Sequence, residues 1–136
     1  MKSRKDPIRT GDFNMKDMCD RVWLDEKGIR RFSPTYYMSV FWLKRIMKNI
    51  RGRILDVGCG DCSKVDCLNN GNTLYVGIDH SEVAVGKARE KGYKVYKQDA
   101  TNFLLNDKFD AILAIDLLEH VREDYKVLEC CWNNLK

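Results

Sequence analysis

The chain has 136 residues, of which 44% are hydrophobic and 32% are charged. This length holds one domain, and this composition is that of a globular protein rather than of a disordered or fibrous chain. The formal net charge of +4 is too small to indicate a nucleic-acid partner by itself.

The sequence predicts neither export nor membrane insertion. The basic start is followed by Asp6-Pro7, where a signal peptide needs an apolar stretch. The most apolar runs, 36–43 and 111–118, are much shorter than the roughly 20 residues that span a bilayer. Six cysteines occur without the loop-rich composition of a secreted disulfide scaffold. We therefore expect free thiols in a cytoplasmic protein.

The first part of the chain divides into a polar segment, 1–32, and a helix. The segment is weakly patterned, and we interpret it as a leader or a lid over a site. Ser33-Pro34 is typical of a helix start, and Gly52 of its end. The apolar positions at helical spacing are Tyr36, Val40, Leu43, Met47 and Ile50. Because Tyr37 lies off this stripe, we expect Tyr37 or Trp23 to contact a ligand.

Lys44, Lys48 and Arg51 share the other face of this helix. A basic face of this kind is compatible with RNA binding. Cations in the last turns of a helix are also stabilised by its dipole and usually face water. We favour the second interpretation, and RNA remains an alternative partner.

From residue 53 onward, short apolar runs alternate with capped helices, which predicts a parallel sheet covered by helices. The predicted strands are 54–57, 73–78, 93–98 and 109–115. Lys94 and Lys97 indicate that the third strand lies at an edge. The nearly continuous apolar sequence of the fourth strand predicts burial on both faces.

The helices between these strands are predicted from their caps and apolar spacing. One begins near Ser63 with Val65 and Leu68 inward and ends at Gly71. The next is capped by Ser81, turns Val85 and Ala88 inward and ends at Gly92. The last helix places Tyr125, Leu128, Trp132 and Leu135 on one face. Cys130 and Cys131 point apart on it, so we expect one in the core and the other half-exposed.

The segment Ile54 to Ser63 is a strand that runs into a Gly-rich turn and then into a helix. Gly58 and Gly60 lack the Cβ atoms that would block a ligand from the backbone, and N–H groups at a helix start can bind an anionic group. Dinucleotide binders and S-adenosylmethionine binders both use this geometry. A dinucleotide site would need glycine at position 63, where the chain has Ser63.

These motifs resemble the class I S-adenosylmethionine-dependent methyltransferase family from about residue 33 to the C-terminus. The resemblance implies an α/β fold, a Rossmann-like open parallel sheet flanked by helices. It also implies methyl transfer from S-adenosyl-L-methionine, and the sequence Leu118-Glu119-His120-Val121 is frequent among small-molecule methyltransferases. We therefore expect a small-molecule methyl acceptor.

The resemblance also implies which residues bind the cofactor. They are Asp56, Gly58, Cys59, Gly60, Asp79, His80, Asp99, Ala100 and Asp116. Asp56 would place the methionine end, Asp79 would accept hydrogen bonds from both ribose hydroxyls, and Asp99 would bind the adenine amine. Cys62 departs from the glycine often found at its position in the family.

His120 is a weak candidate for a catalytic base, because a neutral imidazole can accept a proton from an acceptor hydroxyl. We favour the alternative that Glu119 and His120 position the turn beside the adenosine. The sulfonium is already activated, so alignment of acceptor and methyl group can suffice.

The chain has a cysteine spacing like that of metal ligands, at Cys59, Cys62 and Cys67. A structural zinc needs four ligands, and Asp61 and Asp66 are the only further candidates nearby. We therefore expect no metal site.

Family members continue beyond the fourth strand and its helix, so we expect the chain to be the N-terminal part of a domain, truncated there. The fourth strand would then be an open apolar edge, which predicts self-association. Two alternative functions remain. One is a dinucleotide-binding oxidoreductase fragment, and the other is a non-catalytic interaction module that uses the fourth strand.

Overall fold

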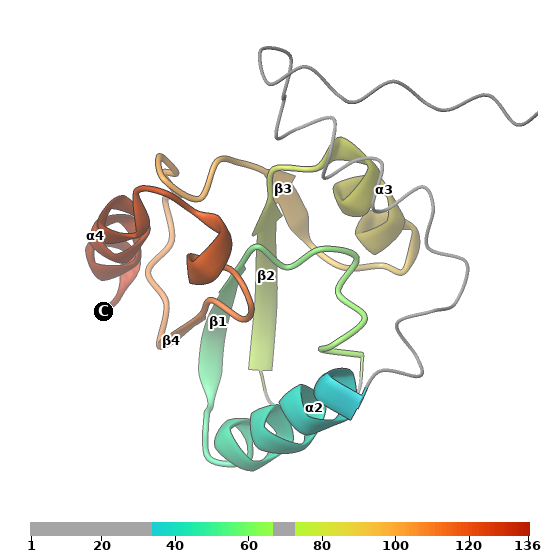
Figure 1. Cartoon of the computed structure of the whole chain (residues 1–136). Coiled ribbons are helices and arrows are strands. Elements are labelled where there is room, and N and C mark those ends of the chain that lie inside the picture. The colour runs from blue at the N-terminus through green and yellow to red at the C-terminus, as the bar shows by residue number, and fades with distance from the viewer. Residues whose placement is uncertain (1–33, 67–72) are drawn as a thin grey trace, which may run out of the picture.

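A computed structural model describes residues 34–66 and 73–136 (Figure 1). Its helices and strands are α2 (Pro34–Met47), β1 (Gly52–Val57), β2 (Thr73–Asp79), α3 (Glu82–Glu90), β3 (Val95–Lys97), β4 (Ala111–Leu113), the 3-10 helix η2 (Leu118–His120) and α4 (Asp124–Asn134). The strands form one four-stranded sheet in the order β3-β2-β1-β4. The predicted segment 1–32, with Trp23, lies outside the described residues.

All strand pairs in this sheet are parallel. Val57 at the end of β1 pairs with Ile78, and Asp56 pairs with Leu113 on the other side. The carboxyl ends of the strands therefore meet at one edge of the sheet, at the top in Figure 1. This confirms the Rossmann-like open parallel sheet, in which ligands bind at that edge.

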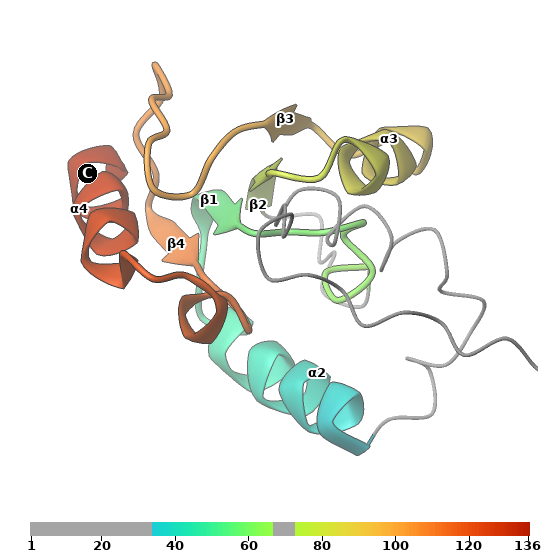
Figure 2. The ribbon, with the colours of Figure 1, turned by 45° about the horizontal axis from the view of Figure 1, so that its top comes forward.

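The two faces of the sheet are covered by different helices. Ile54 and Leu113 are buried against Leu43 and Met47 of α2. The residues of β1 that point the other way, such as Leu55, form a core with Val127 of α4 and with the buried Phe103 and Phe109. In Figure 2, α2 lies below the strands and α4 to their left. The alternation of side chains along β1 thus assigns one face to each helix.

The first helix has the predicted buried face but ends earlier than expected. Val40, Leu43 and Met47 are buried, and Tyr37 is exposed as predicted. Because Gly52 is already the first residue of β1, the chain must turn between Met47 and the strand. The guanidinium of Arg51 donates to the carbonyls of Lys48 and Ile50, at 2.8 and 3.0 Å. Lys44, Lys48 and Arg51 are all exposed, as expected of a face that lies toward water.

The segment after β1 is described only in its first part. Residues 61–66 form turns, and the N–H of Asp66 donates to the carbonyl of Cys62 at 3.1 Å. Cys62, which precedes the predicted helix start near Ser63, has a φ of +61°. Val65 is buried as predicted, whereas Leu68 and Gly71 lie outside the described residues. The cap of α3 is confirmed, because the Ser81 side chain accepts from the N–H of Ala84.

The last two strands are shorter than predicted. β3 has three residues and lies at an edge of the sheet, as expected. β4 also has three residues. Just before it, the Asp110 side chain accepts a hydrogen bond from the backbone N–H of Arg53. Phe109, which was predicted to begin the strand, pairs with Leu135. Both faces of β4 are covered as predicted, because Ile112 packs on the core with α4 and Leu113 on the core with α2, although only Leu113 is fully buried.

The apolar face of α4 is exposed. Tyr125, Leu128 and Trp132 share this face, as predicted, and Trp132 keeps 75% of its surface exposed. The residues that face the core are Val127 and Asn134, with Cys130 and Cys131 both half-buried beside them. The expectation of one core cysteine and one half-exposed cysteine was therefore wrong.

None of the described helices is both long enough and apolar enough to cross a membrane.

Candidate functional site

The segment that follows β1 is a tight turn made by glycines. Gly58 and Gly60 have φ angles of +76° and +56°, a region that residues with a Cβ atom rarely adopt. The N–H groups of Gly58 and Cys59 donate to the carbonyl of Ile78, at 2.8 and 3.1 Å. A Cβ atom on Gly58 would lie 2.9 Å from Cδ1 of Leu117. The turn therefore crosses the end of β2 and lies against the segment after β4.

Asp79, the last residue of β2, joins this turn to the start of α3. Its Oδ2 accepts a hydrogen bond from the N–H of Gly60 at 2.8 Å, and its Oδ1 accepts one from the N–H of Ser81 at 2.8 Å. The bond to Ser81 places a negative charge at the start of α3, and the bond to Gly60 places it against a backbone donor of the turn; both are favourable. The carboxylate thus fixes both the turn and the helix relative to β2.

Asp99 follows β3 and lies close to the end of β2. Its Oδ1 accepts from the N–H and the hydroxyl of Thr101, at 2.8 and 2.7 Å. These hydrogen bonds lower the pKa of Asp99, and the nearby His80 lowers it further. The N–H of Gln98 donates to the carbonyl of Asp79 at 3.1 Å. The strand-end residues predicted for the ribose and the adenine therefore lie side by side.

Asp116 follows β4 and has a φ of +51°, a conformation that aspartate tolerates better than most residues. Its carboxylate forms an ion pair with Lys64, from the segment after the glycine turn. Since Leu117 also lies against Gly58, the ends of β1 and β4 are held together. The carboxyl ends of all the described strands thus converge on the glycine turn.

Asp56 lies beneath this turn rather than in it. Its side chain is buried, and its Oδ2 accepts a hydrogen bond from the Tyr75 hydroxyl at 2.8 Å. Burial raises the pKa of Asp56 to about 7, although the hydrogen bond from Tyr75 and the charge of Lys64 act in the opposite direction. Asp56 can therefore support the turn from below.

The remaining predicted residues lie at the rim. His120 is the last residue of η2, where its N–H donates to the carbonyl of Leu117 at 2.9 Å and its side chain is exposed. Ala100 is half-buried against the core formed with α4. His120 thus stays a weak candidate for a base, on the exposed side of the loop after β4.

The described residues 34–66 and 73–136 contain no group of three or more His, Cys, Asp or Glu side chains that could hold a metal ion. Cys62 is buried and Cys59 is half-buried, each as a free thiol. Cys67, the third cysteine of the metal-like pattern, lies outside the described residues.

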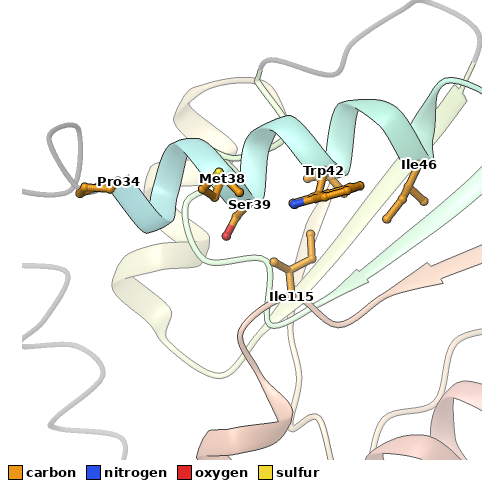
Figure 3. Close-up of a pocket in the computed structure, with 7 residues that line it drawn as sticks. Pro34, Met38, Ser39, Trp42, Ile46 and Ile115 are labelled. Atoms are coloured by element: carbon orange, nitrogen blue, oxygen red, sulfur yellow. The ribbon is translucent and has the colours of Figure 1, made fainter.

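An apolar groove of about 570 Å³ lies between α2 and Ile115, in the segment after β4 (Figure 3). Its lining residues are Pro34, Met38, Ser39, Trp42, Leu43, Ile46 and Ile115. Ile115 directly precedes Asp116 in the chain, so the groove begins next to the carboxyl end of β4.

Residues 54–136 match the sequence family of the methyltransferase domain. The chain belongs to this methyltransferase domain family. The matched region contains the glycine turn and the carboxylates that follow β2, β3 and β4. S-adenosylmethionine is the cofactor of this family, as the resemblance implied.

The methyltransferase domain is similar in sequence to the ubiquinone biosynthesis O-methyltransferase of Pasteurella multocida (strain Pm70), at 30% identity over 137 aligned residues. The alignment covers 85% of this chain and 56% of that enzyme. The chain spans about half the length of the curated relatives it matches.

Two solved structures show the same fold. An S-adenosylmethionine-dependent methyltransferase from Thermotoga maritima, described as a possible histamine N-methyltransferase, matches with a TM-score of 0.67 and 25% identity, over 88% of this chain and 53% of that one. The cyclase SpnF matches with a TM-score of 0.61 and 27% identity, over 70% of this chain and 40% of that one. The second likeness shows that this fold also occurs in a cyclase.

The geometry of the methyltransferase domain fits the cofactor. The N–H groups of Gly58, Cys59 and Gly60 are bonded to β2, which fixes the turn, and each oxygen of Asp79 uses one hydrogen bond to the backbone. A carboxylate oxygen can accept about two, so Asp79 retains capacity for ribose hydroxyls. Asp99 lies next to it, where an adenine amine could be bound.

Two residues of the site were not predicted from the sequence. Tyr75 is the partner of Asp56, and Lys64 is the partner of Asp116. The parallel register places Tyr75 opposite Ile54, on the same face as Asp56. A buried aspartate within an apolar strand needs a donor, so the alternation of β2 could have indicated Tyr75. Lys64 had no comparable signal.

We predict that Gly58→Ala destabilises the domain by more than about 1 kcal/mol, because it combines a positive φ with a contact of 2.9 Å to Leu117. The matched control is Gly86→Ala in α3, where a new Cβ meets nothing within 4 Å. That change should stabilise the helix by about 0.5–1 kcal/mol. Urea unfolding measures both, and equal effects would contradict the prediction.

We also predict that stability falls as pH rises from about 4 to about 7, because Asp56 binds a proton more tightly when folded than when unfolded. The loss is of the order of 4 kcal/mol for a shift of about three pKa units. Asp56→Asn cannot ionise and should lack this loss. Urea unfolding at pH 5, 6, 7 and 8 compares the two proteins, and parallel pH profiles would show that Asp56 does not titrate in this range.

Proposed function

We propose that this chain is the S-adenosylmethionine-binding part of a methyltransferase that transfers a methyl group to a small molecule. The observation that carries the proposal is the convergence of the strand ends on the glycine turn, with Asp79 bonded to the N–H of Gly60. The proposed cofactor-binding residues are Gly58, Cys59, Gly60, Asp79, His80, Asp99, Ala100 and Asp116, with Asp56 beneath the turn.

In this proposal the chain binds and orients, and the cofactor supplies the activated methyl group on its sulfonium. Asp79 accepts hydrogen bonds from the ribose hydroxyls, and Asp99 accepts one from the adenine amine. The N–H groups of the turn remain fixed by β2, so little reorganisation is needed on binding. Such positioning can supply much of the rate of a transfer step.

Two observations support a small-molecule acceptor. The relatives carry the name of an O-methyltransferase of ubiquinone biosynthesis. The groove at Met38, Trp42 and Ile115 offers an apolar surface beside the end of β4. RNA is the less favoured acceptor, because Arg51 already donates to the carbonyls at the end of α2.

We predict that S-adenosylhomocysteine binds the wild-type chain and that Asp79→Ala weakens the affinity by about 10- to 150-fold. This range follows from the loss of a charge-assisted hydrogen bond, about 1.5–3 kcal/mol. The matched control is Asp107→Ala, whose carboxylate pairs with Arg53 at the other end of β1. It should bind like the wild type. Isothermal titration calorimetry measures all three, with circular dichroism as the check on folding.

Absence of heat with the wild-type chain, or equal affinity of Asp79→Ala, would contradict the proposal. Enhanced NADH fluorescence with the protein would instead favour the dinucleotide alternative. Because SpnF shares the fold, methyl transfer from labelled S-adenosylmethionine must be assayed separately from binding.

A second proposal is self-association through β4 and α4. Among the described strands, β4 pairs with β1 alone, and α4 exposes Leu128 and Trp132. We predict a concentration-dependent dimer at micromolar concentration in sedimentation equilibrium, lost in Trp132→Glu. Leu104→Glu is the control, because the Leu104 side chain is even more exposed than that of Trp132 but lies on the loop between β3 and β4. A wild-type monomer would contradict this proposal.

A further inference from the structure

The glycine turn contains two thiols, Cys59 and Cys62, whose sulfur chemistry has no part in the methyltransferase proposal. The N–H of Cys62 donates to the carbonyl of Cys59 at 3.1 Å, which closes a turn of four residues. The Cα atoms at the ends of such a turn lie within about 7 Å, and a disulfide requires about 4.4–6.8 Å. Cys59 packs against the buried apolar cluster that contains Cys62. The backbone is therefore arranged so that these sulfurs can bond.

The surroundings of Cys62 offer a route for its proton. Its Sγ lies 3.5 Å from the Tyr75 hydroxyl, which donates to Oδ2 of Asp56 at 2.8 Å. Hydrogen bonds with Cys59 and with Tyr75 lower the pKa of Cys62. Since the pKa of Asp56 is about 7, its carboxylate can take up a proton near neutral pH. The thiol proton can thus pass through Tyr75 to Asp56.

The two thiols differ in access. Cys62 is 1% exposed, whereas Cys59 is half-buried at the turn. A soluble oxidant therefore reaches Cys59 first, and Cys62 is placed to attack from within. The hydrogen bond to Cys62 and burial raise the pKa of Cys59, which makes the first step slow.

We propose that Cys59 and Cys62 form a reversible dithiol–disulfide site within the glycine turn. With glutathione disulfide as the oxidant, the sulfur of Cys59 attacks, the glutathione S–S bond breaks, and one glutathione leaves as a thiol. The thiolate of Cys62 then attacks the sulfur of Cys59, and the second glutathione leaves. The protein pair loses two electrons and two protons, which the two glutathione thiols carry.

Oxidation should change cofactor binding, a consequence that rests on the proposed function. Gly60 lies between the two cysteines, and its N–H holds Asp79 at 2.8 Å. A bond of about 2.05 Å between the sulfurs is much shorter than any non-bonded contact between them, so its formation pulls on this turn. We expect affinity for S-adenosylhomocysteine to fall about 5- to 150-fold, the usual range of such coupling. By linkage, bound S-adenosylhomocysteine lowers the equilibrium constant for disulfide formation by the same factor.

The first test is disulfide mapping of the full chain in a Cys67→Ser background, equilibrated in glutathione buffers of rising oxidised fraction. Peptide mass spectrometry should find one Cys59–Cys62 disulfide, which excess reduced glutathione reverses. Cys131→Ser should behave like this parent, since Cys131 lies on α4, outside the glycine turn. Cys62→Ser should retain one glutathione on Cys59. No Cys59–Cys62 bond, or pairing of either with another cysteine, would overturn the proposal.

The second test addresses the proton route. Tyr75→Phe removes the hydroxyl that accepts the Cys62 proton and passes one to Asp56, so the mixed disulfide on Cys59 should accumulate and close more slowly than in the parent. Tyr96→Phe is the control, a tyrosine on β3 that is more exposed. Equal closure rates in Tyr75→Phe and the parent would overturn this route, while the mapping of the parent decides the disulfide independently.

The third test compares calorimetry of reduced, oxidised and re-reduced protein with S-adenosylhomocysteine. Weaker binding by the oxidised form, restored on reduction, is the expected result. A disulfide with unchanged affinity would overturn the coupling. If the reduced chain binds no ligand, the proposed function and the coupling fail, and the mapping result still decides whether the disulfide forms.

Discussion

The arrangement of this site depends on the carboxylate of Asp79. It accepts from the N–H groups of Gly60 and Ser81, so one side chain at the end of β2 fixes the turn after β1 and the start of α3. Both donors would otherwise face the ligand side without a partner. The same carboxylate retains acceptor capacity, which explains how a structural contact and a ligand contact can share one residue.

A second layer lies beneath the turn. Asp56, Tyr75 and Cys62 are joined by hydrogen bonds on the face of β1 that α2 and α3 cover. Burying a carboxylate costs free energy, and the raised pKa of Asp56 expresses that cost. A relative with a glycine at position 62 would have no second thiol there. The cluster is therefore a property of this chain in addition to its family fold.

The fold and the reaction are separate conclusions. The family match and the parallel sheet establish the methyltransferase domain, but a cyclase shares the fold. What points to S-adenosylmethionine is the local chemistry at the strand ends, where glycine backbone and carboxylates converge. The exposed stripe of α4 and the free side of β4 are further surfaces that the described residues leave accessible.

The sequence by itself determined the strands, their order of appearance, the cap at Ser81 and the carboxylates at the strand ends, because period, caps and glycines are local signals. It did not predict the positive φ of Cys62 in the turn after β1. It also did not predict which way the stripe of α4 faces. Only the tertiary structure decided these points and paired Asp56 with Tyr75 and Lys64 with Asp116, because such contacts join residues far apart in the chain.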